Sequence, residues 1–287
     1  MPSKVVFLRT SLRMGSPAFS MRRSARGNME FFADEYIRWL AADRGVAAGD
    51  YFNDHLKRFR ETETLMSSIG GRRVLEIGAI DYMQLFLSHR LGFTDVWGSY
   101  FSTDVDHKYY RRTVEGVGRT VEVTAVSVNI ENEMFPVQSG SFDLVVFCEV
   151  LEHMDVDPMF ALAEINRVLS VGGKLVLTTP NSCSANIVWK NLMGCRPHFY
   201  MQYHKDRSPY RHNFEHDVRT VSALLAGAGF SIDVLDTRDV FQPTNVKATD
   251  FLKKHAFPTE HRGDDIMVLA TKTGPIKNRW PAEVYVG

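Results

Sequence analysis

Apolar residues recur along this chain with two spacings, and the spacings alternate from Arg73 onward. Short apolar runs such as Leu144–Phe147 are typical of strands in a parallel sheet that is covered on both faces. Segments whose apolar residues lie three or four positions apart predict helices. Strands are predicted at Arg73–Ile77, Asp95–Tyr100, Val121–Val128, Phe142–Phe147, Lys174–Thr179, Ser231–Thr237 and Asp265–Thr271, and helices at Tyr82–Leu91, Pro158–Leu169 and Val218–Ala228.

The region before the first strand predicts helices alone. Its large apolar residues follow a helical spacing, as at Phe32, Tyr36 and Leu40. Alternating strands and helices then predict a doubly wound sheet, with a ligand at the carboxyl ends of its strands. We therefore divide the chain into a basic N-terminal arm (residues 1–28), a helical segment (29–70) and one α/β domain (71–287), with an insertion at 182–212.

Composition narrows the class of protein. Apolar residues make up 44% and charged residues 24%, the balance of a soluble globular enzyme, and 34 basic residues match 34 acidic ones. This neutrality predicts no bulk attraction to nucleic acid or to an anionic membrane. No apolar run reaches the roughly 18 residues of a membrane span. The three cysteines Cys148, Cys183 and Cys195 have no paired spacing, which favours a reducing cytoplasm over a disulfide framework.

The N-terminal arm carries basic residues and no acid before Glu30. A mitochondrial presequence, a mobile arm that contacts a partner and a poorly ordered terminus all share this composition, and the last is the simplest interpretation.

The end of the first predicted strand carries Glu76 and Gly78, where glycine lets the backbone approach a ligand. No G-x-G-x-x-G follows, so a dinucleotide cradle is not supported. A more specific pattern spans residues 141–181, from Ser141-Phe-Asp-Leu-Val-Val-Phe-Cys-Glu-Val-Leu-Glu-His-Met154 to Gly172-Gly-Lys-Leu-Val-Leu-Thr-Thr-Pro-Asn181. Here the sequence resembles class I methyltransferases that use S-adenosylmethionine (SAM), and a weaker resemblance runs from Tyr51 to Lys272.

The resemblance implies a Rossmann-like α/β fold with a seven-stranded, mostly parallel sheet, helices on both faces and an N-terminal helical extension. It also implies SAM as the methyl donor. Glu76, Gly78 and Ala79 would hold its amino-acid end, Asn129 and Ile130 would lie beside the adenine, and Cys148 and Glu149 would open onto the methyl group.

Two departures from the family pattern concern the cofactor. Ile80 and Tyr82 replace the later glycines of the E-x-G-x-G-x-G motif, and Tyr100 stands where the family has an acid for the ribose. Either Asp104 reaches back to the ribose, or the ribose is held differently. These departures also leave open a chain that has lost its cofactor and serves as a partner subunit.

Glu149, Glu152 and His153 have the i, i+3, i+4 spacing that places side chains on one face of a helical turn. With the later His-x-Phe-Glu at His212, they resemble the metal site of small-RNA 2′-O-methyltransferases. Ubiquinone-pathway O-methyltransferases share the first element. By that match Glu149, Glu152, His153 and His212 would bind a divalent metal; such a set suits Mn²⁺, Fe²⁺ or Zn²⁺, whereas Mg²⁺ usually prefers oxygen ligands. Alternatively, these side chains bind no metal and only cap the turn or form a hydrogen bond with a neighbouring residue.

The acceptor side is predicted at the insertion 182–212, which is rich in aromatic and basic residues and would form a lid. Features such as Thr179-Pro-Asn181 resemble bacterial methyltransferases that act on glycans or secondary metabolites. We therefore expect O-methylation of a hydroxyl on a glycan, glycolipid or secondary metabolite, with His153 and His212 as the catalytic residues. The 2′-hydroxyl of an RNA is the alternative acceptor, which the neutral charge and the lack of a recognisable RNA-binding module disfavour.

Overall fold

The computed structural model describes residues 30–44, 51–101, 109–196 and 211–286. Residues Phe31–Gly287 form one compact unit, so the N-terminal helices belong to the same unit as the sheet. The predicted basic arm and Asp104 lie outside the described residues.

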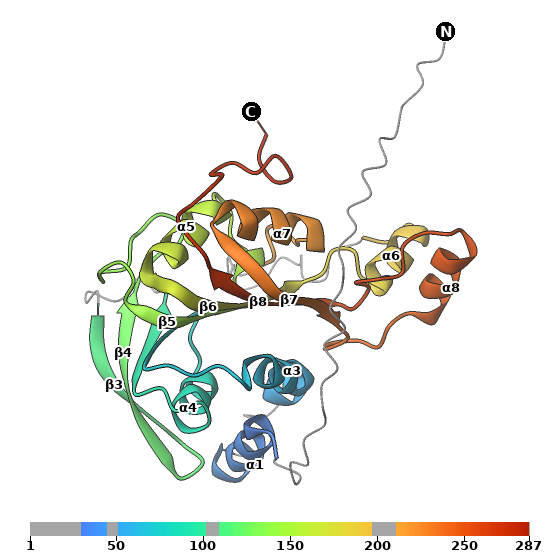
Figure 1. Cartoon of the computed structure of the whole chain (residues 1–287). Coiled ribbons are helices and arrows are strands. Elements are labelled where there is room, and N and C mark those ends of the chain that lie inside the picture. Colours follow the sequence, from blue (N-terminus) through green and yellow to red (C-terminus); the bar gives the residue numbers. More distant parts are fainter. Residues whose placement is uncertain (1–29, 45–50, 102–108, 197–210, 287) are drawn as a thin grey trace. The chain divides into compact units, whose positions relative to one another are not determined.

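A single sheet organises the described chain (Figure 1). Its strands are β1 (Arg73–Ile77), β2 (Asp95–Tyr100), β3 (Tyr109–Gly116), β4 (Arg119–Ser127), β5 (Phe142–Cys148), β6 (Leu169–Pro180), β7 (Phe230–Arg238) and β8 (Asp265–Lys272). The spatial order is β3-β4-β2-β1-β5-β6-β8-β7. The central strands β4, β2, β1, β5 and β6 are parallel, so their carboxyl ends share one edge of the sheet.

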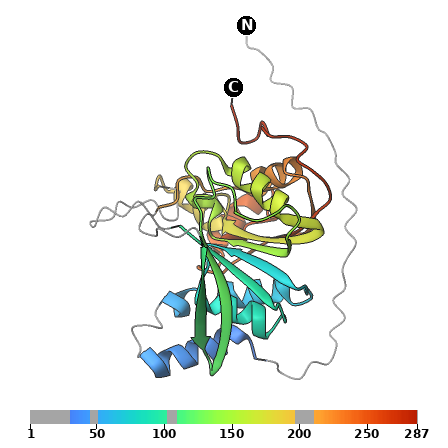
Figure 2. The same cartoon turned by 90° about the vertical axis from the view of Figure 1, so that its left-hand side faces the viewer.

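Helices cover both faces of the sheet, as Figures 1 and 2 show. On one face lie α1 (Phe32–Arg44), α3 (Leu56–Met66) and α4 (Asp81–His89), and on the other α5 (Pro158–Val168) and α7 (Val218–Gly227). The helices α6 (Ala185–Leu192) and α8 (Val246–Lys254) pack against each other beside the ends of β6 and β8. Each face of the sheet has its own cluster of buried apolar side chains, which explains the unbroken apolar runs in β1 and β5.

The prediction of seven strands missed β3. This strand pairs antiparallel with β4 at the edge of the sheet, and the two are joined at Val117-Gly118, both with positive φ (56° and 62°). Because an edge strand has few buried side chains, its sequence Tyr-Tyr-Arg-Arg-Thr-Val-Glu-Gly carries no apolar run. Two-residue hairpin loops require positive φ, and Val117 is not a residue that signals it.

Tyr82, which replaces a glycine of the family motif, anchors the N-terminal helices. Its side chain is fully buried, and its hydroxyl donates to Glu63 Oε1 at 2.5 Å. The same carboxylate on α3 accepts the backbone N–H groups of Phe32 and Ala33 at the start of α1 (3.0 and 2.7 Å). Tyr82 therefore ties α4 to α3, and Glu63 ties α3 to α1.

Replacing Tyr82 by phenylalanine is expected to lower the free energy of unfolding by about 1–2 kcal/mol, because the buried Glu63 carboxylate loses one of its donors. Urea denaturation measures the change. Tyr110→Phe on the exposed side of β3 is the matched control and should leave the midpoint unaltered.

The C-terminal segment is fastened to the start of α5 by Asp157. Its carboxylate caps the helix by accepting from Phe160 N at 3.2 Å, and it also accepts from Tyr285 Oη (2.5 Å) and pairs with Arg279. Burial by itself raises the pKa of Asp157, but the hydrogen bonds from Arg279 and Tyr285 outweigh it and lower the pKa.

Asp157→Ala is expected to reduce the free energy of unfolding at pH 7 by about 1–2 kcal/mol. Because the pKa of Asp157 is lower in the folded state, its charge stabilises the fold at pH values above the unfolded pKa, which is near 3.9. This stabilisation is lost as the pH falls through the folded pKa. The difference between wild type and variant should therefore shrink toward pH 3. A difference that stays constant between pH 7 and pH 3 would show that the charge on Asp157 does not matter.

None of the helices in the described ranges has the length and apolarity needed to cross a membrane.

Candidate functional site

A cavity opens at the carboxyl ends of β1 and β5, under α3. Residues of these three elements, of α4 and of the adjoining segments line it: Tyr51, Arg58, Phe59, Thr62, Glu76, Ile77, Gly78, Ile80, Met83, Val146, Cys148 and Glu149. Four of the predicted cofactor residues, Glu76, Gly78, Cys148 and Glu149, therefore share one cavity. Ile80 forms part of the wall, and Tyr82 is turned away into the core.

The loop after β1 is shaped by Glu76 and Gly78. Glu76 Oε1 accepts from Ile80 N at 3.1 Å, whereas its buried Oε2 has no hydrogen-bonding partner among the described residues. Burial raises the pKa of this carboxyl well above its usual range. Gly78 has φ +72°, and a Cβ there would lie 2.8 Å from Val150 Cγ2, so no other residue fits without a shift. An unpartnered carboxylate oxygen at a cavity wall is ready to accept from a ligand.

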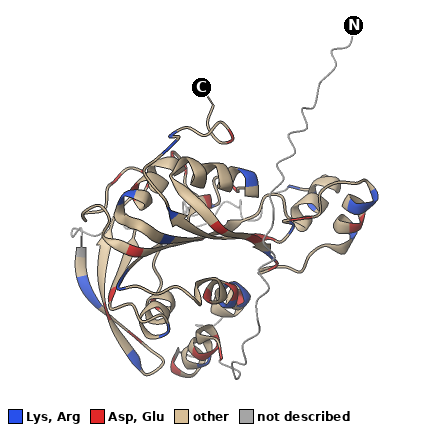
Figure 3. Ribbon diagram, viewed as in Figure 1, with Lys and Arg blue, Asp and Glu red and all other residues tan. Residues whose placement is uncertain are grey.

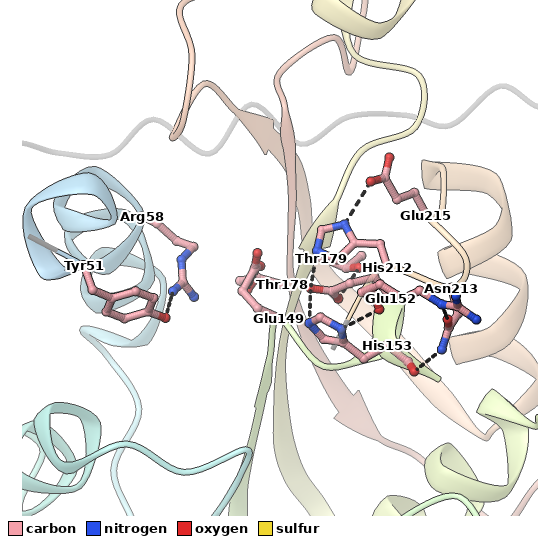
Figure 4. Close-up of polar contacts among 11 residues, drawn as sticks. Tyr51, Arg58, Glu149, Glu152, His153, Thr178, Thr179, His212, Asn213 and Glu215 are labelled. Atoms are coloured by element: carbon pink, nitrogen blue, oxygen red, sulfur yellow. Dashed lines mark hydrogen bonds and ion pairs between the residues drawn. The ribbon is translucent and has the colours of Figure 1, made fainter. Parts of the chain in front are cut away.

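Arg58 on α3 is a functional candidate that the sequence did not single out. Its side chain is buried in the cavity wall, its Nε has no hydrogen-bonding partner in the described part of the chain, and its Nη2 reaches Tyr51 Oη at a long 3.5 Å. Burial acts to lower the pKa of Arg58, but Glu149, Tyr51 and Asp265 raise it above its usual value. Figure 4 shows Arg58 and Tyr51 on one side of the site and Glu149 opposite. A buried, under-satisfied guanidinium of this kind suits a ligand carboxylate.

Glu149 leaves the strand in an unusual conformation. Its φ is +54°, its backbone N–H donates to Thr178 O, and its Oε1 accepts from Thr178 Oγ1 at 2.7 Å. The expected helical turn begins later, as the 3-10 helix Leu151–His153. The prediction that Glu149 shares a helix face with Glu152 and His153 is therefore wrong, because the left-handed residue aims Glu149 into the cavity.

Three of the four predicted metal ligands converge. One atom each from Glu152, His153 and His212 lies within 4.8 Å of the others. Glu152 Oε1 is 3.8 Å from His153 Nε2 and 4.0 Å from His212 Nε2 (Figure 4). This oxygen is buried and has no hydrogen-bonding partner among the described residues, while Oε2 accepts from Thr179 Oγ1. Glu149 does not belong to this group.

The two imidazoles are held so that both Nε2 atoms face Glu152. His153 Nδ1 bonds the carbonyl oxygen of Arg211 at 2.9 Å, and His212 Nδ1 bonds Glu215 Oε1 at 2.9 Å. Since both partners are acceptors, each Nδ1 donates, and Nε2 is then the acceptor nitrogen of a neutral ring. Asn213 fixes the two segments together by donating its backbone N–H to Glu152 O and its Nδ2 to His153 O. Two nitrogen donors and one carboxylate oxygen, each oriented by an outer partner, fit a transition-metal ion.

Asp265 is a second residue that the sequence did not single out. It begins β8 beside Pro180 and is fully buried, yet neither carboxylate oxygen has a hydrogen-bonding partner in the described chain. Burial raises the pKa of Asp265 well above the usual range, and the negative charge of Glu149 adds to this shift. The positive charge of Arg58 opposes the shift. Asp265, Glu149 and Arg58 therefore belong to one electrostatic network.

The remaining predicted residues lie around this centre. Ala79 donates its backbone N–H to Ser99 O, and Asn129 Oδ1 accepts from Glu131 N. Ile130 is buried in the apolar cluster of the α5 face, so its side chain packs in the core. Tyr100 lies at the end of β2, as expected. Of the insertion 182–212, the structure describes α6 and residues 211–212, and the predicted lid residues 197–210 lie outside the described ranges.

The comparisons with known proteins agree with this arrangement. Residues 82–177 match the family model described as a methyltransferase domain, a stretch that runs from α4 through β6. By this match the chain carries a methyltransferase domain. The cavity at β1 and β5 lies at the edge of the sheet where a doubly wound fold binds its ligand. No curated protein sequence matches the chain.

Solved structures share the fold. A chain from the complex between the Haloferax volcanii Trm112 methyltransferase activator and a methyltransferase has a TM-score of 0.50 at 14% identity, covering 88% of this chain and 100% of that chain. A SAM-dependent methyltransferase from Mesorhizobium loti has a TM-score of 0.47 at 16% identity, covering 75% and 97%. One from Archaeoglobus fulgidus has a TM-score of 0.48 at 16% identity, covering 76% and 93%. At these identities the likeness concerns the fold alone.

Proposed function

We propose that this methyltransferase transfers the methyl group of SAM to a hydroxyl oxygen of a glycan, glycolipid or secondary metabolite. The convergence of Glu152, His153 and His212 next to the cavity carries the proposal. A hydroxyl is a weak nucleophile that has to lose its proton during the transfer. The three converging side chains are of the kinds that promote this loss. The methyl group itself is already activated, so the other requirement is alignment of acceptor and donor.

The cavity supports a specific orientation of the cofactor. The amino-acid end of SAM carries a carboxylate and an ammonium group. Arg58 would bind the carboxylate, and the unpartnered Oε2 of Glu76 would accept from the ammonium. Glu149, directly after β5, then lies on the side of the metal candidates, where the methyl group is to be delivered.

The donor set supports a divalent metal at Glu152, His153 and His212. Mn²⁺, Fe²⁺ or Zn²⁺ suits two imidazoles and one carboxylate better than Mg²⁺ does. Such an ion lowers the pKa of a coordinated hydroxyl. In this proposal His153 and His212 present Nε2, Glu152 supplies the negative charge, and Glu215 and the carbonyl of Arg211 fix the two rings. The proposed site thus omits Glu149, which stays with the cofactor.

The test is transfer from tritiated SAM to fractions of cell extract. A methyl ether survives mild alkali, whereas a methyl ester releases methanol. We expect alkali-stable label in a glycan, lipid or small-molecule fraction, and loss of that label when EDTA is present. Label on an amine, or label released as methanol, would contradict the proposal. Labelling that EDTA does not reduce would contradict a role for the metal. His153 or His212 would then act as the base directly.

The second candidate acceptor is the 2′-hydroxyl at the end of an RNA. The pairing of the His212–Glu215 segment with Glu152 and His153 favours it, because this is the pair of elements in the resemblance to small-RNA methyltransferases. Against it, Figure 3 shows basic and acidic residues intermixed over the helices of the described chain, without an extended basic face in that view. Ribonuclease-sensitive label, with transfer that falls steeply as salt rises, would select this acceptor.

A further inference from the structure

Three aromatic side chains meet at the rim of the cavity described above. Tyr51 lines the cavity, and its ring stacks on His55 with the centroids 4.2 Å apart and the planes at 27°. His55 in turn meets Phe241 edge to face, at 5.4 Å and 81°. Tyr51 is 51% exposed, and His55 and Phe241 are partly exposed. We call these three residues the aromatic platform; its rings offer an apolar surface to a ligand that enters the cavity.

Hydrogen bonds fix the aromatic platform in place. His55 Nδ1 donates to the carbonyl oxygen of Tyr51 at 2.7 Å, which leaves Nε2 as the acceptor nitrogen of a neutral ring. Burial lowers the pKa of His55, so the ring stays neutral near pH 7. The buried carboxylate of Asp264 accepts the backbone N–H groups of Phe241 at 3.2 Å and of Gln242 at 2.6 Å. Little ordering is therefore left for a ligand to induce at the platform.

A second, smaller pocket adjoins the platform through Gln242, the residue after Phe241. The pocket lies between the end of β6, α6 and the segment that leads to α8, and Asn186, Lys190 and Gln242 are among its lining residues. Within the described ranges, the Lys190 ammonium group and the Gln242 amide have no hydrogen-bonding partner. Asn186 Nδ2 donates to Pro243 O at 3.2 Å, which leaves its Oδ1 as an acceptor. Amide and ammonium groups of this kind can bind hydroxyl groups of a ligand.

The position and the charge of these residues indicate what they bind. The platform and the second pocket come from both sides of residues 82–177, which match the methyltransferase domain, and so they lie outside the part that the family shares. Acceptor choice belongs to such segments rather than to the shared fold. Of the described residues that line the second pocket, Lys190 and Asp264 carry opposite charges and the others are neutral. This balance favours a neutral ligand over a chain of phosphates.

We propose that the aromatic platform and the second pocket bind neighbouring sugar units of a neutral oligosaccharide acceptor. This inference rests on the function proposed above and narrows the acceptor to a carbohydrate of at least two units. A sugar ring has an apolar C–H face that covers the rings of Tyr51 and Phe241, and His55 Nε2 accepts from one of its hydroxyls. Asn186, Lys190 and Gln242 bind hydroxyls of the next unit.

The experiment uses the full chain, tritiated SAM and the neutral carbohydrate fraction of a cell extract as acceptor. The labelled product should be larger than a monosaccharide, and acid hydrolysis should release the label as an O-methyl monosaccharide. Phe241→Leu and Gln242→Ala should each raise the half-saturating concentration of the fraction by about 3- to 10-fold, as for the loss of one stacked ring or one hydrogen-bonding group. The maximal rate and the calorimetric affinity for SAM should stay within about twofold of wild type.

Phe257→Leu is the matched control, because Phe257 is an exposed phenylalanine that lines neither cavity. It should behave as wild type, and thermal unfolding of each variant reports whether the fold is kept. Unchanged half-saturation in both folded variants would overturn the inference, as would alkali-stable label that acid hydrolysis does not release as a methylated sugar. In either case O-methylation itself would stand. Absence of alkali-stable label from every fraction of the extract would instead contradict the proposed function.

Discussion

His153→Ala is expected to lower the rate of methyl transfer by at least about 10³-fold while the affinity for SAM stays within about twofold of wild type. The reason is the position of His153: its Nε2 faces Glu152 and His212, outside the residues that line the cofactor cavity. His212→Ala and Glu152→Gln should act in the same way, because each removes one of the three converging atoms. Single-turnover transfer from tritiated SAM measures the rate, and calorimetry measures the affinity.

A readout independent of the acceptor accompanies this prediction. Titration with Mn²⁺ should show one tight site in the wild type, and that site should be lost in His153→Ala and His212→Ala. His255→Ala, an exposed histidine that follows α8, is the matched control and should retain both metal binding and transfer. Full activity of His153→Ala would remove this side chain from catalysis. Tight Mn²⁺ binding by the variant would show that the metal lies elsewhere.

The second large effect concerns Arg58. Arg58→Met should raise the Kd for SAM by at least about 100-fold, because a buried guanidinium that meets a ligand carboxylate is worth about 3 kcal/mol or more when it is removed. Arg60→Met is the matched control on the same helix, since Arg60 pairs with Asp34 and lines no part of the cavity. Its affinity for SAM should equal that of wild type.

Decarboxylated SAM sharpens the test of Arg58. The wild type should bind this analogue much more weakly than SAM, whereas Arg58→Met should bind the two about equally, because the variant no longer has a group for the carboxylate. Glu76→Gln should weaken the binding of SAM and of decarboxylated SAM by the same factor, since both ligands keep the ammonium group that Glu76 contacts in the proposal. The same variant should abolish turnover. If Arg58→Met still preferred SAM by the wild-type factor, Arg58 would not contact the carboxylate.

The centre of the fold could be predicted from sequence because its signals are local. The first two strands, β1 and β2, begin and end at the predicted residues, and α5 and α7 differ from the predicted helices by a single residue at their ends. Buried parallel strands show unbroken apolar runs, and helices packed on a sheet show apolar residues three or four positions apart. Both signals reflect burial, so the pattern of apolar residues along the chain reveals them directly. The edge strand β3 and the helices α6 and α8 bury few side chains, and so the same signals were weak there.

The site was predictable where its residues belong to one motif. Glu76, Gly78, Cys148 and Glu149 line one cavity, and Glu152, His153 and His212 converge as expected. Arg58 and Asp265 were missed because each is brought to the centre by long-range packing, Arg58 from a helix before the sheet and Asp265 from its last strand. The conformation of Glu149 was missed because positive φ in a glutamate has no sequence signal.

Tyr82 illustrates how a departure from a family pattern acquires a reason in the structure. In the sequence it is a lost glycine that puts cofactor binding in question. In the fold it is a buried anchor between α4 and Glu63, while Gly78 retains the close approach to the cavity. The replaced glycine position therefore serves the N-terminal helices, among which α3 lines the cavity with Arg58, Phe59 and Thr62.

A crystal structure of the protein with S-adenosylhomocysteine tests the central claim most directly. The ligand should lie under α3, with its carboxylate at Arg58, its ammonium group at Glu76 Oε2 and its sulfur near Glu149, on the side that faces His153. Density for the ligand in another part of the molecule, or a cavity at Gly78 that stays empty at saturating ligand, would contradict the account.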